Sequence, residues 1–292
     1  MSRHVVVTGA GGFAGGAIAA RLSELGFNVT AMSRRPPDAD RNDAGLAWRT
    51  ADLRAQDSLP PRFDALIHCA AEIPGRLPDP EPLYNSNIDM ARSVFDQALA
   101  AGARTVAFMS SMSVYGTIDV PVVTEETPSN APDAYGRAKR DAETMLEEIV
   151  GQGLPSGLSI RLPGTVGKGS HHNFLSDALG RVLSGDVVRA NNPDAMFNNI
   201  VHVGDLADFL ARWIDAPRPG YAVTNLAAPE PIAIREVVSL LFRTAGRPER
   251  IEESVGGKKP FLIGLDRPTA LGYRPKTTRA SIEAFVRDNL TL

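Results

Sequence analysis

Short apolar runs alternate with longer segments of helical periodicity over the first 165 residues of the chain. The apolar runs predict buried strands, whereas apolar positions three and four residues apart predict amphipathic helices. Strands that alternate with helices of ten or more residues predict right-handed crossovers, and therefore an α/β fold with a doubly wound parallel sheet. The predicted helices are Phe13–Leu25, a segment from about residue 82 to residue 102, and Pro132–Val150. The predicted strands are His4–Thr8, Phe27–Met32, Leu46–Asp52, Asp64–Ala70, Thr105–Ser110 and Leu158–Leu162.

The pattern changes after Pro163, where predicted elements become shorter and polar stretches more frequent. We expect helices over Asn173–Leu183, from an N-cap at Asp205 to about residue 215, and over Ile232–Thr244. Strands are predicted over Ile200–Val203 and Tyr221–Leu226, a turn at Asn191–Pro193, and loops over Gly164–Ser170 and Glu252–Lys259. These segments predict two lobes. The larger comprises residues 1–163 with about 200–227, and a smaller C-terminal α/β lobe comprises residues 164–199 and 228–292.

Composition narrows the class of protein. The chain has 31 Lys and Arg residues against 34 Asp and Glu residues, which predicts no general attraction to nucleic acid or to an anionic membrane. Cys69 is the single cysteine, which excludes a disulfide within the chain and fits a reducing compartment. The five histidines are dispersed, so no metal site is predicted. We therefore expect a cytoplasmic globular protein.

Glycines separate the first predicted strand from the first predicted helix, in the segment Thr8–Gly15 (TGAGGFAG). Two registers fit this segment, with Gly9, Gly12 and Gly15 in one and Gly9, Gly11 and Ala14 in the other. A glycine turn at a helix N-terminus lets backbone amides approach a pyrophosphate. The sequence therefore predicts a dinucleotide site. The second strand is followed by Ser33, Arg34 and Arg35 rather than by a carboxylate, which favours NADP(H) over the alternative, NAD(H).

Tyr135 and Lys139 lie four residues apart in a predicted helix, which places both side chains on one helical face. A nearby cation favours phenolate, so we expect Lys139 to lower the pKa of Tyr135 and to prepare the phenol for proton exchange. Upstream, Ser110 and Ser111 follow an apolar strand, at the edge where open α/β sheets bind ligands. A serine there could hydrogen-bond the same substrate oxygen as the tyrosine.

Together these motifs resemble the extended short-chain dehydrogenase/reductases, the NAD(P)-dependent epimerase/dehydratase family, over nearly the whole chain. The resemblance implies a Rossmann sheet with a substrate lobe, a sugar-like small-molecule substrate, and a homodimer formed through helices near residues 87–101 and 132–150. The matching segments are Thr8–Gly15, Asp52-Leu53, His68–Ala71, Asn87, Ser110-Ser111 with Val114–Gly116, Tyr135 with Lys139, Arg161–Pro163, Val201–Ala207 and Leu271–Pro275.

The resemblance also implies roles for individual residues. Ser111, Tyr135 and Lys139 take the catalytic positions. The expected cofactor-binding residues are Gly9, Gly11, Gly12, Phe13, Ala14, Gly15, Ser33, Arg34, Arg35, Asp52, Leu53, Cys69, Ala70, Ala71, Asn87, Tyr135, Lys139 and Pro163. The expected substrate residues are Ser113, Lys168, His172, Asn173 and Asn198.

Two departures from the family pattern narrow the reaction. Met112 and Ser113 stand where sugar-nucleotide dehydratases carry an acidic pair, so dehydration is not expected. Asn198 stands where many nucleotide-sugar epimerases carry a diphosphate-binding arginine, although Lys168, Lys258 or Lys259 could compensate. We predict an NADP(H)-dependent reductase or dehydrogenase. The alternatives are an NAD-dependent nucleotide-sugar 4-epimerase and, from another class, a non-catalytic NADP-binding sensor.

Overall fold

The computed structural model describes residues 2–35, 45–257 and 259–290. The chain forms two compact units. The first comprises Met1–Thr117, Pro128–Arg161 and Ala207–Thr224, and the second comprises Ile118–Thr127, Leu162–Leu206 and Asn225–Leu292. Within the described part of the chain, every helix is too short or too polar to cross a bilayer.

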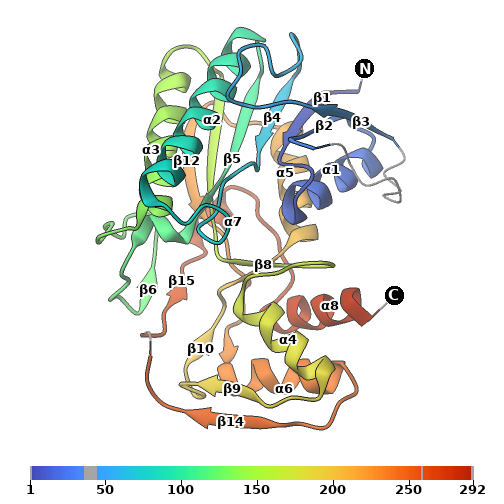
Figure 1. Cartoon of the computed structure of the whole chain (residues 1–292), viewed down its shortest axis with the longest axis vertical. Helices are drawn as coiled ribbons and strands as arrows, with labels where there is room; N and C mark the ends of the chain where they lie inside the picture. Colours follow the sequence, from blue (N-terminus) through green and yellow to red (C-terminus); the bar gives the residue numbers. More distant parts are fainter. Residues whose placement is uncertain (1, 36–44, 258, 291–292) are drawn as a thin grey trace. The chain divides into compact units, whose positions relative to one another are not determined.

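A seven-stranded sheet forms the centre of the first unit, in the order β12-β7-β5-β4-β1-β2-β3 (Figure 1). The pairs from β3 through β2, β1 and β4 to β5 are parallel, and Val6 of β1 pairs with Thr30 on one side and Leu66 on the other. The order reverses between β1 and β4, the position at which open α/β sheets bind ligands. The strands are β1 (His4–Thr8), β2 (Asn28–Ser33), β3 (Leu46–Thr50), β4 (Ala65–His68), β5 (Thr105–Ser111), β7 (Ser156–Leu162) and β12 (Gly220–Asn225).

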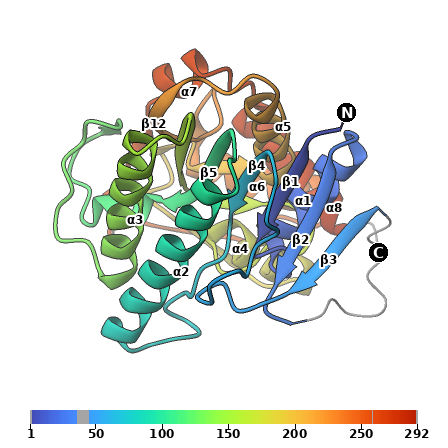
Figure 2. The same ribbon diagram turned by 90° about the horizontal axis from the view of Figure 1, so that it is seen from above.

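Helices cover both faces of this sheet, which confirms the prediction of a doubly wound α/β fold. On one face lie α2 (Pro80–Ala100) and α3 (Ala134–Gly151), side by side in Figure 2. The other face carries α1 (Phe13–Glu24) and α5 (Val203–Asp215), which are joined by an ion pair between Arg21 and Asp208 of 2.9 Å. The short 3-10 helix η1 (Met112–Tyr115) directly follows β5.

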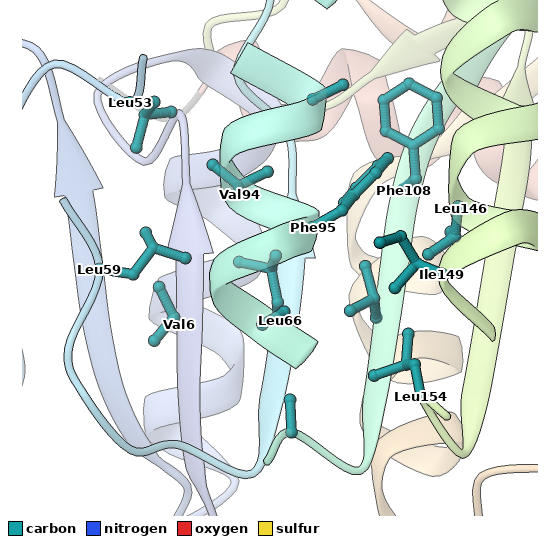
Figure 3. Packing of buried hydrophobic residues seen from close by; sticks show 14 of the residues in the cluster. Val6, Leu53, Leu59, Leu66, Val94, Phe95, Phe108, Leu146, Ile149 and Leu154 are labelled. Carbon is teal, nitrogen blue, oxygen red and sulfur yellow. The ribbon is translucent and has the colours of Figure 1, made fainter. Parts of the chain in front are cut away.

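The hydrophobic core of the first unit lies between the sheet and the pair α2–α3 (Figure 3). Phe95 of α2 packs edge to face on Phe108 of β5, with 5.7 Å between the ring centroids. Leu66 of β4 and Leu146 of α3 are completely buried in the same cluster. Burying a side chain of this size contributes about 1.5–3 kcal/mol. This face of the sheet is therefore backed by a well-packed core.

The second unit has a core of its own, formed by α4, α6 and α8 and including Leu179, Leu241 and Phe285. Its strands pair as two-stranded sheets: β8 with β11, β9 with β14, β10 with β13 and β6 with β15. Its helices are α4 (Phe174–Ser184), α6 (Ile234–Thr244), α7 (Asp266–Ala270) and α8 (Thr278–Leu290). Its strands are β6 (Val122–Val123), β8 (Gly164–Val166), β9 (Val188–Asn191), β10 (Met196–Phe197), β11 (Ile200–His202), β13 (Ile232–Ala233), β14 (Ile251–Ser254) and β15 (Leu262–Ile263).

Three predictions about the C-terminal half are wrong. The predicted loop Gly164–Ser170 begins with strand β8, and the predicted loop Glu252–Lys259 begins within strand β14. Both strands are short and have little apolar alternation, so their pairing partners rather than their own sequence create them. Asp205 does not cap its helix, because α5 begins earlier, at Val203. Its carboxylate instead accepts hydrogen bonds from the backbone N and from Nζ of Lys276.

Candidate active site

The glycine turn between β1 and α1 is closed too tightly for any larger residue. Gly9 has φ +70°, and a Cβ there would lie 2.7 Å from the backbone N of Ala70. A Cβ at Gly15 would overlap the carbonyl of Gly9, whose oxygen also accepts a hydrogen bond of 2.9 Å from the N–H of Gly12. Gly12 caps α1 without a side chain, so the first amides of the helix stay open to an anion.

Beside this turn lies a cavity of about 660 Å³ within the first unit. Pockets of 300–1,000 Å³ are typical of small-molecule and cofactor sites. The predicted residues that line the cavity are Gly9, Gly11, Gly12, Ser33, Arg34, Arg35, Asp52, Leu53, Cys69, Ala70 and Ala71. The lining residues that the sequence did not single out are Met32, Ala51, Arg54, Glu72, Arg76, Ser86 and Met90.

Seven predicted cofactor residues lie outside that lining, and the first unit contains six of them. Phe13, Ala14 and Gly15 form the first turn of α1, and Asn87 belongs to α2. Tyr135 and Lys139 lie on α3. Pro163 directly follows β7 and belongs to the second unit.

Arginine dominates the charge of the cavity. Arg34 forms an ion pair with Glu72, and Arg54 binds Asp52 through two hydrogen bonds, of 3.0 and 2.7 Å. The side-chain hydrogen bonds from Arg54, and to a smaller extent a hydrogen bond from its backbone N–H, lower the pKa of Asp52 to about 2. Arg35 and Arg76 form no ion pair with any residue in the described ranges. Four guanidinium groups against two carboxylates give the lining a formal charge of +2, which suits a ligand that carries phosphates.

Asn87 supports the cavity wall from behind. Its amide nitrogen donates to the carbonyl of Glu72 over 3.0 Å, and its amide oxygen accepts from the N–H of Glu72 over the same distance. The side chain is 6% exposed. Asn87 therefore fixes the backbone that follows β4, and the side chains of that segment line the cavity. Its position mid-helix, in an otherwise apolar face, is the sequence signal for this role.

The predicted catalytic residues come from β5 and α3, and the predicted substrate residue Ser113 comes from η1. Ser111 ends β5, and its hydroxyl donates to Ser113 Oγ over 3.1 Å and accepts from the N–H of Ser113. Gly136, next to Tyr135, packs so closely on the Ser113 carbonyl that a Cβ would overlap it. The start of α3 therefore lies directly against the segment that carries Ser111 and Ser113.

Lys139 is buried below Tyr135 on the same face of α3. Its Nζ donates to the Met109 carbonyl over 2.8 Å and lies 5.6 Å from the centroid of the Tyr135 ring. The Lys139 side chain is 3% exposed, and this burial lowers its pKa to about 8, against opposing contributions from Cys69 and Glu143. The ammonium therefore remains mostly charged at neutral pH despite its burial.

The predicted depression of the tyrosine pKa is wrong for this chain. Burial, with a smaller contribution from Asp133, raises the pKa of Tyr135 to about 12. Desolvation disfavours the phenolate, and the Lys139 ammonium is engaged by the Met109 carbonyl rather than by the phenol oxygen. The phenol is therefore neutral at pH 7.

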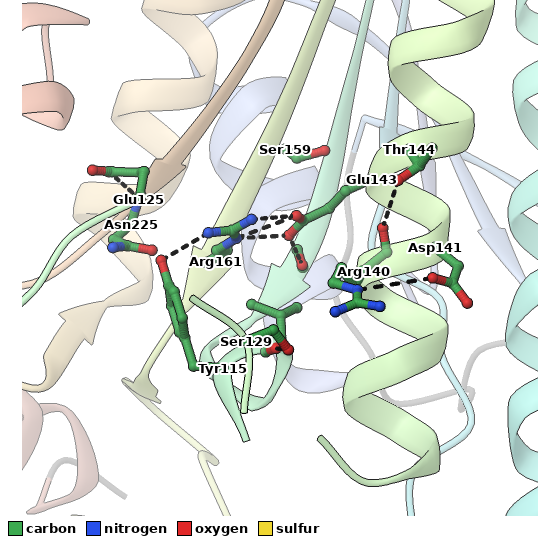
Figure 4. Close-up of polar contacts among 12 residues, drawn as sticks. Tyr115, Glu125, Ser129, Arg140, Asp141, Glu143, Thr144, Ser159, Arg161 and Asn225 are labelled. Atoms are coloured by element: carbon green, nitrogen blue, oxygen red, sulfur yellow. Dashed lines mark hydrogen bonds and ion pairs between the residues drawn. The ribbon is translucent and has the colours of Figure 1, made fainter. Parts of the chain in front are cut away.

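Sequence reasoning missed a buried ion pair one turn beyond Lys139 (Figure 4). Glu143 accepts from Arg161 of β7, with 2.7 Å between Arg161 Nη2 and Glu143 Oε2. A further nitrogen of Arg161, Nη1, donates to the Tyr115 hydroxyl over 2.8 Å. The spacing of Tyr135, Lys139 and Glu143, four residues each, was the signal that could have revealed Glu143.

Apart from Ser113, the predicted substrate residues belong to the second unit. Asn173 caps α4 by accepting from the N–H of Ser176 over 3.0 Å. Asn198 is 2% exposed, and its amide binds both backbone groups of Ile263, at 2.9 and 3.0 Å. Lys168 and His172 are exposed. Lys259 pairs with Asp119 over 3.1 Å, and Lys258 lies outside the described residues.

Known proteins are similar to this chain over nearly its whole length. The UDP-glucose 4-epimerase of Streptomyces lividans is 25% identical over 312 residues, which cover 97% of this chain and 94% of that protein. The dTDP-4-dehydro-6-deoxy-D-allose reductase of a Streptomyces species is 26% identical over 319 residues, covering 98% and 95%. The fold matches a structure of MoeE5 in complex with UDP-glucuronic acid and NAD, with a TM-score of 0.80, 24% identity and coverage of 98% and 97%.

A model of one protein family matches residues 5–227, which include the glycine turn, the cavity wall, Ser111, Tyr135 and Lys139. The match therefore covers the residues that build the site as well as most of the chain. The chain belongs to the NAD dependent epimerase/dehydratase family of enzymes.

Proposed function

We propose that this enzyme is an NADP(H)-dependent reductase or dehydrogenase that interconverts a carbonyl and a hydroxyl on a sugar-like substrate. The observation that carries the proposal is the position of the Tyr135–Lys139 pair. It lies at the carboxyl end of β5, in the same unit as a cavity lined by four arginines and a glycine turn. This edge of the sheet can hold a dinucleotide and present a proton donor to a substrate oxygen.

The residues divide into holding and proton-transfer roles. Gly9, Gly11 and Gly12 would present backbone amides to the pyrophosphate, and Arg34 and Arg35 would take the 2′-phosphate. When bound, the nicotinamide supplies or accepts the hydride. In the reducing direction, the neutral Tyr135 phenol donates a proton to the carbonyl oxygen of the substrate. The hydroxyl of Ser111 donates a hydrogen bond to the same oxygen, and the charged Lys139 binds the ribose and stabilises negative charge on the phenol.

A second candidate is an NAD-dependent nucleotide-sugar 4-epimerase, which the similarity to the Streptomyces lividans enzyme favours. It would use the same Ser111, Tyr135 and Lys139. The two candidates differ in whether the cofactor is consumed. With UDP-glucose and with dTDP-linked ketosugars as probes, a net change in absorbance at 340 nm indicates a reductase or dehydrogenase. Interconversion of sugars without that change indicates an epimerase.

Cofactor preference can be measured before any substrate is known. We expect NADPH to bind at least about tenfold more tightly than NADH, because charge-assisted hydrogen bonds to a phosphate are worth about 1.4 kcal/mol or more. Fluorescence titration of the purified enzyme measures both affinities. The double variant Arg34→Ala/Arg35→Ala should remove the preference, while Arg92→Ala on the exposed side of α2 should keep it. Equal affinities in the unchanged enzyme would contradict the assignment of NADP(H).

The Tyr135→Phe variant tests the catalytic assignment. Loss of the phenol hydroxyl should lower turnover by about 10²–10⁴-fold, the usual contribution of a general acid, and leave NADPH affinity nearly unchanged. Normal cofactor binding with undiminished turnover would remove Tyr135 from the mechanism. An absence of turnover in the unchanged enzyme, with every sugar and nucleotide sugar screened, would instead favour a non-catalytic NADP sensor.

The proposal extends to the substrate, the oligomeric state and the cellular location of the enzyme. We propose a small-molecule, sugar-like substrate, with Ser113, Lys168, His172, Asn173 and Asn198 as candidate contacts. Asn173 and Asn198 already hold backbone groups, which leaves Ser113 with the strongest support because of its hydrogen bond to Ser111. A homodimer and a cytoplasmic location complete the proposal, the latter supported by the single cysteine.

A further inference from the structure

The ion pair between Glu143 and Arg161 is largely buried. Glu143 and Arg161 have side-chain exposures of 6% and 12%. Three hydrogen bonds join them: Arg161 Nε to Oε1 at 3.0 Å and to Oε2 at 3.2 Å, and Nη2 to Oε2 at 2.7 Å. A buried ion pair adds little net stability, because the desolvation of both charges offsets their attraction. Stability alone therefore does not explain its presence beside the site.

The pair joins every element that carries a proposed catalytic group. Glu143 lies on α3, two turns beyond Tyr135 and one turn beyond Lys139. Its carboxylate also accepts from the hydroxyl of Ser110, the neighbour of Ser111 in β5. Arg161 donates to the hydroxyl of Tyr115, the last residue of η1, and its guanidinium lies 4.9 Å from the centroid of that ring. One carboxylate and one guanidinium thus hold α3, β5, η1 and β7 in a single frame.

We propose that Glu143 and Arg161 are the positioning residues of this active site, and that they hold the Tyr135–Lys139 face of α3 in register with Ser111 and keep Lys139 charged. The proposal rests on the function proposed above. In this proposal, Glu143 and Arg161 contact neither the cofactor nor the substrate. Tyr135, Lys139 and Ser111 perform the chemistry. The pair of Glu143 and Arg161 fixes the positions of these side chains and the charge state of Lys139.

The electrostatic part follows from what surrounds Lys139. His68 and Cys69 face it from the end of β4, Met109 and Phe108 from β5, and Tyr135 and Glu143 from its own helix. His68 is neutral because burial lowers its pKa to about 3, and Cys69 is neutral because burial raises its pKa to about 12. Tyr135 is also neutral at pH 7. Cys69 and Glu143 both raise the pKa of Lys139, and because the thiol is neutral at pH 7, Glu143 is the group among these described neighbours that carries a negative charge there.

The test uses the five lysines of the chain, which make lysine-selective NMR simple. Protein with ¹³C-labelled lysine gives five side-chain signals, and Lys139→Arg assigns the signal of Lys139. In Glu143→Gln, which removes the charge and keeps the shape, we expect the titration midpoint of Lys139 to fall by about one pH unit, the usual effect of a nearby charge. Glu143→Asp, which keeps the charge, should restore most of the midpoint.

Glu148→Gln is the matched control, because Glu148 lies on the same helix and is exposed. It should leave the Lys139 midpoint and the affinity for NADPH unchanged. Glu143→Gln should weaken NADPH binding, measured by fluorescence at pH 8, by about fivefold, because the charged fraction of Lys139 falls there from about a half to about a tenth. A Lys139 midpoint in Glu143→Gln equal to that in Glu148→Gln would overturn the electrostatic part of the proposal.

A double variant tests the contribution of the whole pair and guards against misfolding of the single variant. Glu143→Leu/Arg161→Met replaces the pair with apolar groups of similar volume, a change that buried ion pairs often tolerate without loss of stability. We expect a retained melting temperature together with NADPH affinity and turnover that both fall at least about tenfold. Unchanged affinity and turnover would overturn the positioning role. If Tyr135→Phe remained active, the proposed function would fail, yet the Lys139 titrations would still report on the pair.

Discussion

His68 shows at the scale of one residue how burial changes an ordinary side chain. Its Nδ1 shares a hydrogen bond of 2.8 Å with the Thr8 hydroxyl, and its ring stacks on Phe108 with 5.6 Å between the centroids. Burial, aided by the positive charge of Lys139, lowers the pKa of His68 to about 3. The folded protein therefore holds a neutral imidazole at pH values where the unfolded chain would protonate it.

This difference makes stability depend on pH in a defined direction. Between about pH 3 and pH 6.5 the unfolded state binds more protons at His68 than the folded state, so stability falls as the pH is lowered through this range. From pH 7.5 to pH 5.5 we expect His68 to account for a loss of about 1.4 kcal/mol in the free energy of unfolding. Urea unfolding at both pH values measures the loss.

His68→Asn should reduce that pH-dependent loss, whatever its effect on stability at pH 7.5. The exposed His171 provides the control, and His171→Asn should show the same pH dependence as the unchanged protein. If His68→Asn kept the full loss between pH 7.5 and pH 5.5, the buried neutral imidazole would not be its source.

At the scale of elements, the contact between α3 and η1 determines the geometry of the site. Asp133 caps α3 by accepting from the N–H of Gly136 over 2.7 Å. The missing side chain of Gly136 lets this first turn pack on the backbone of Ser113. The helix start and the serine segment can therefore approach one another only because residue 136 is glycine.

Gly136→Ala should separate the two elements. Its methyl group would overlap the Ser113 carbonyl, so we expect a loss of about 1–3 kcal/mol in unfolding free energy, as for other overpacked sites. Turnover should fall as well, because small displacements of catalytic groups cost large factors in rate. Gly151→Ala, at the other end of α3, meets no atom within 4 Å and should stay within about 0.5 kcal/mol. Equal stabilities of the two variants would contradict this packing argument.

At the scale of the whole molecule, each unit contains its own buried core, one on the sheet and one between α4, α6 and α8. The helices α2 and α3 lie side by side on one face of the sheet (Figure 2), and the resemblance to the family predicts that they form a dimer interface. We expect sedimentation equilibrium to give about twice the chain mass of 31.2 kDa at micromolar concentration. A constant mass of 31.2 kDa across that range would exclude the homodimer.

The sequence predicted an element accurately where the structure of that segment depends mainly on its own residues. The run His4–Thr8 was predicted with its observed bounds, because a parallel central strand is apolar on both faces. The glycine turn was equally visible, because glycine is required wherever backbones come this close. The wall residues Arg54, Glu72 and Arg76 had no such signal. They reach the cavity because β3 and β4, the two strands that they follow, end at one edge of the sheet.

The amino-acid pattern by itself determined the alternation of strands and helices, the dinucleotide turn and the pairing of Tyr135 with Lys139 on one helical face. These follow from periodicity and short-range geometry, which act within a few residues. Only the tertiary structure decided the charge states, since the pKa of Tyr135 rises to about 12 and that of Lys139 falls to about 8 through burial by distant segments. The tertiary structure also brought Arg161 of β7 next to Glu143 of α3. Desolvation and ion pairing both depend on which strands and helices meet in space.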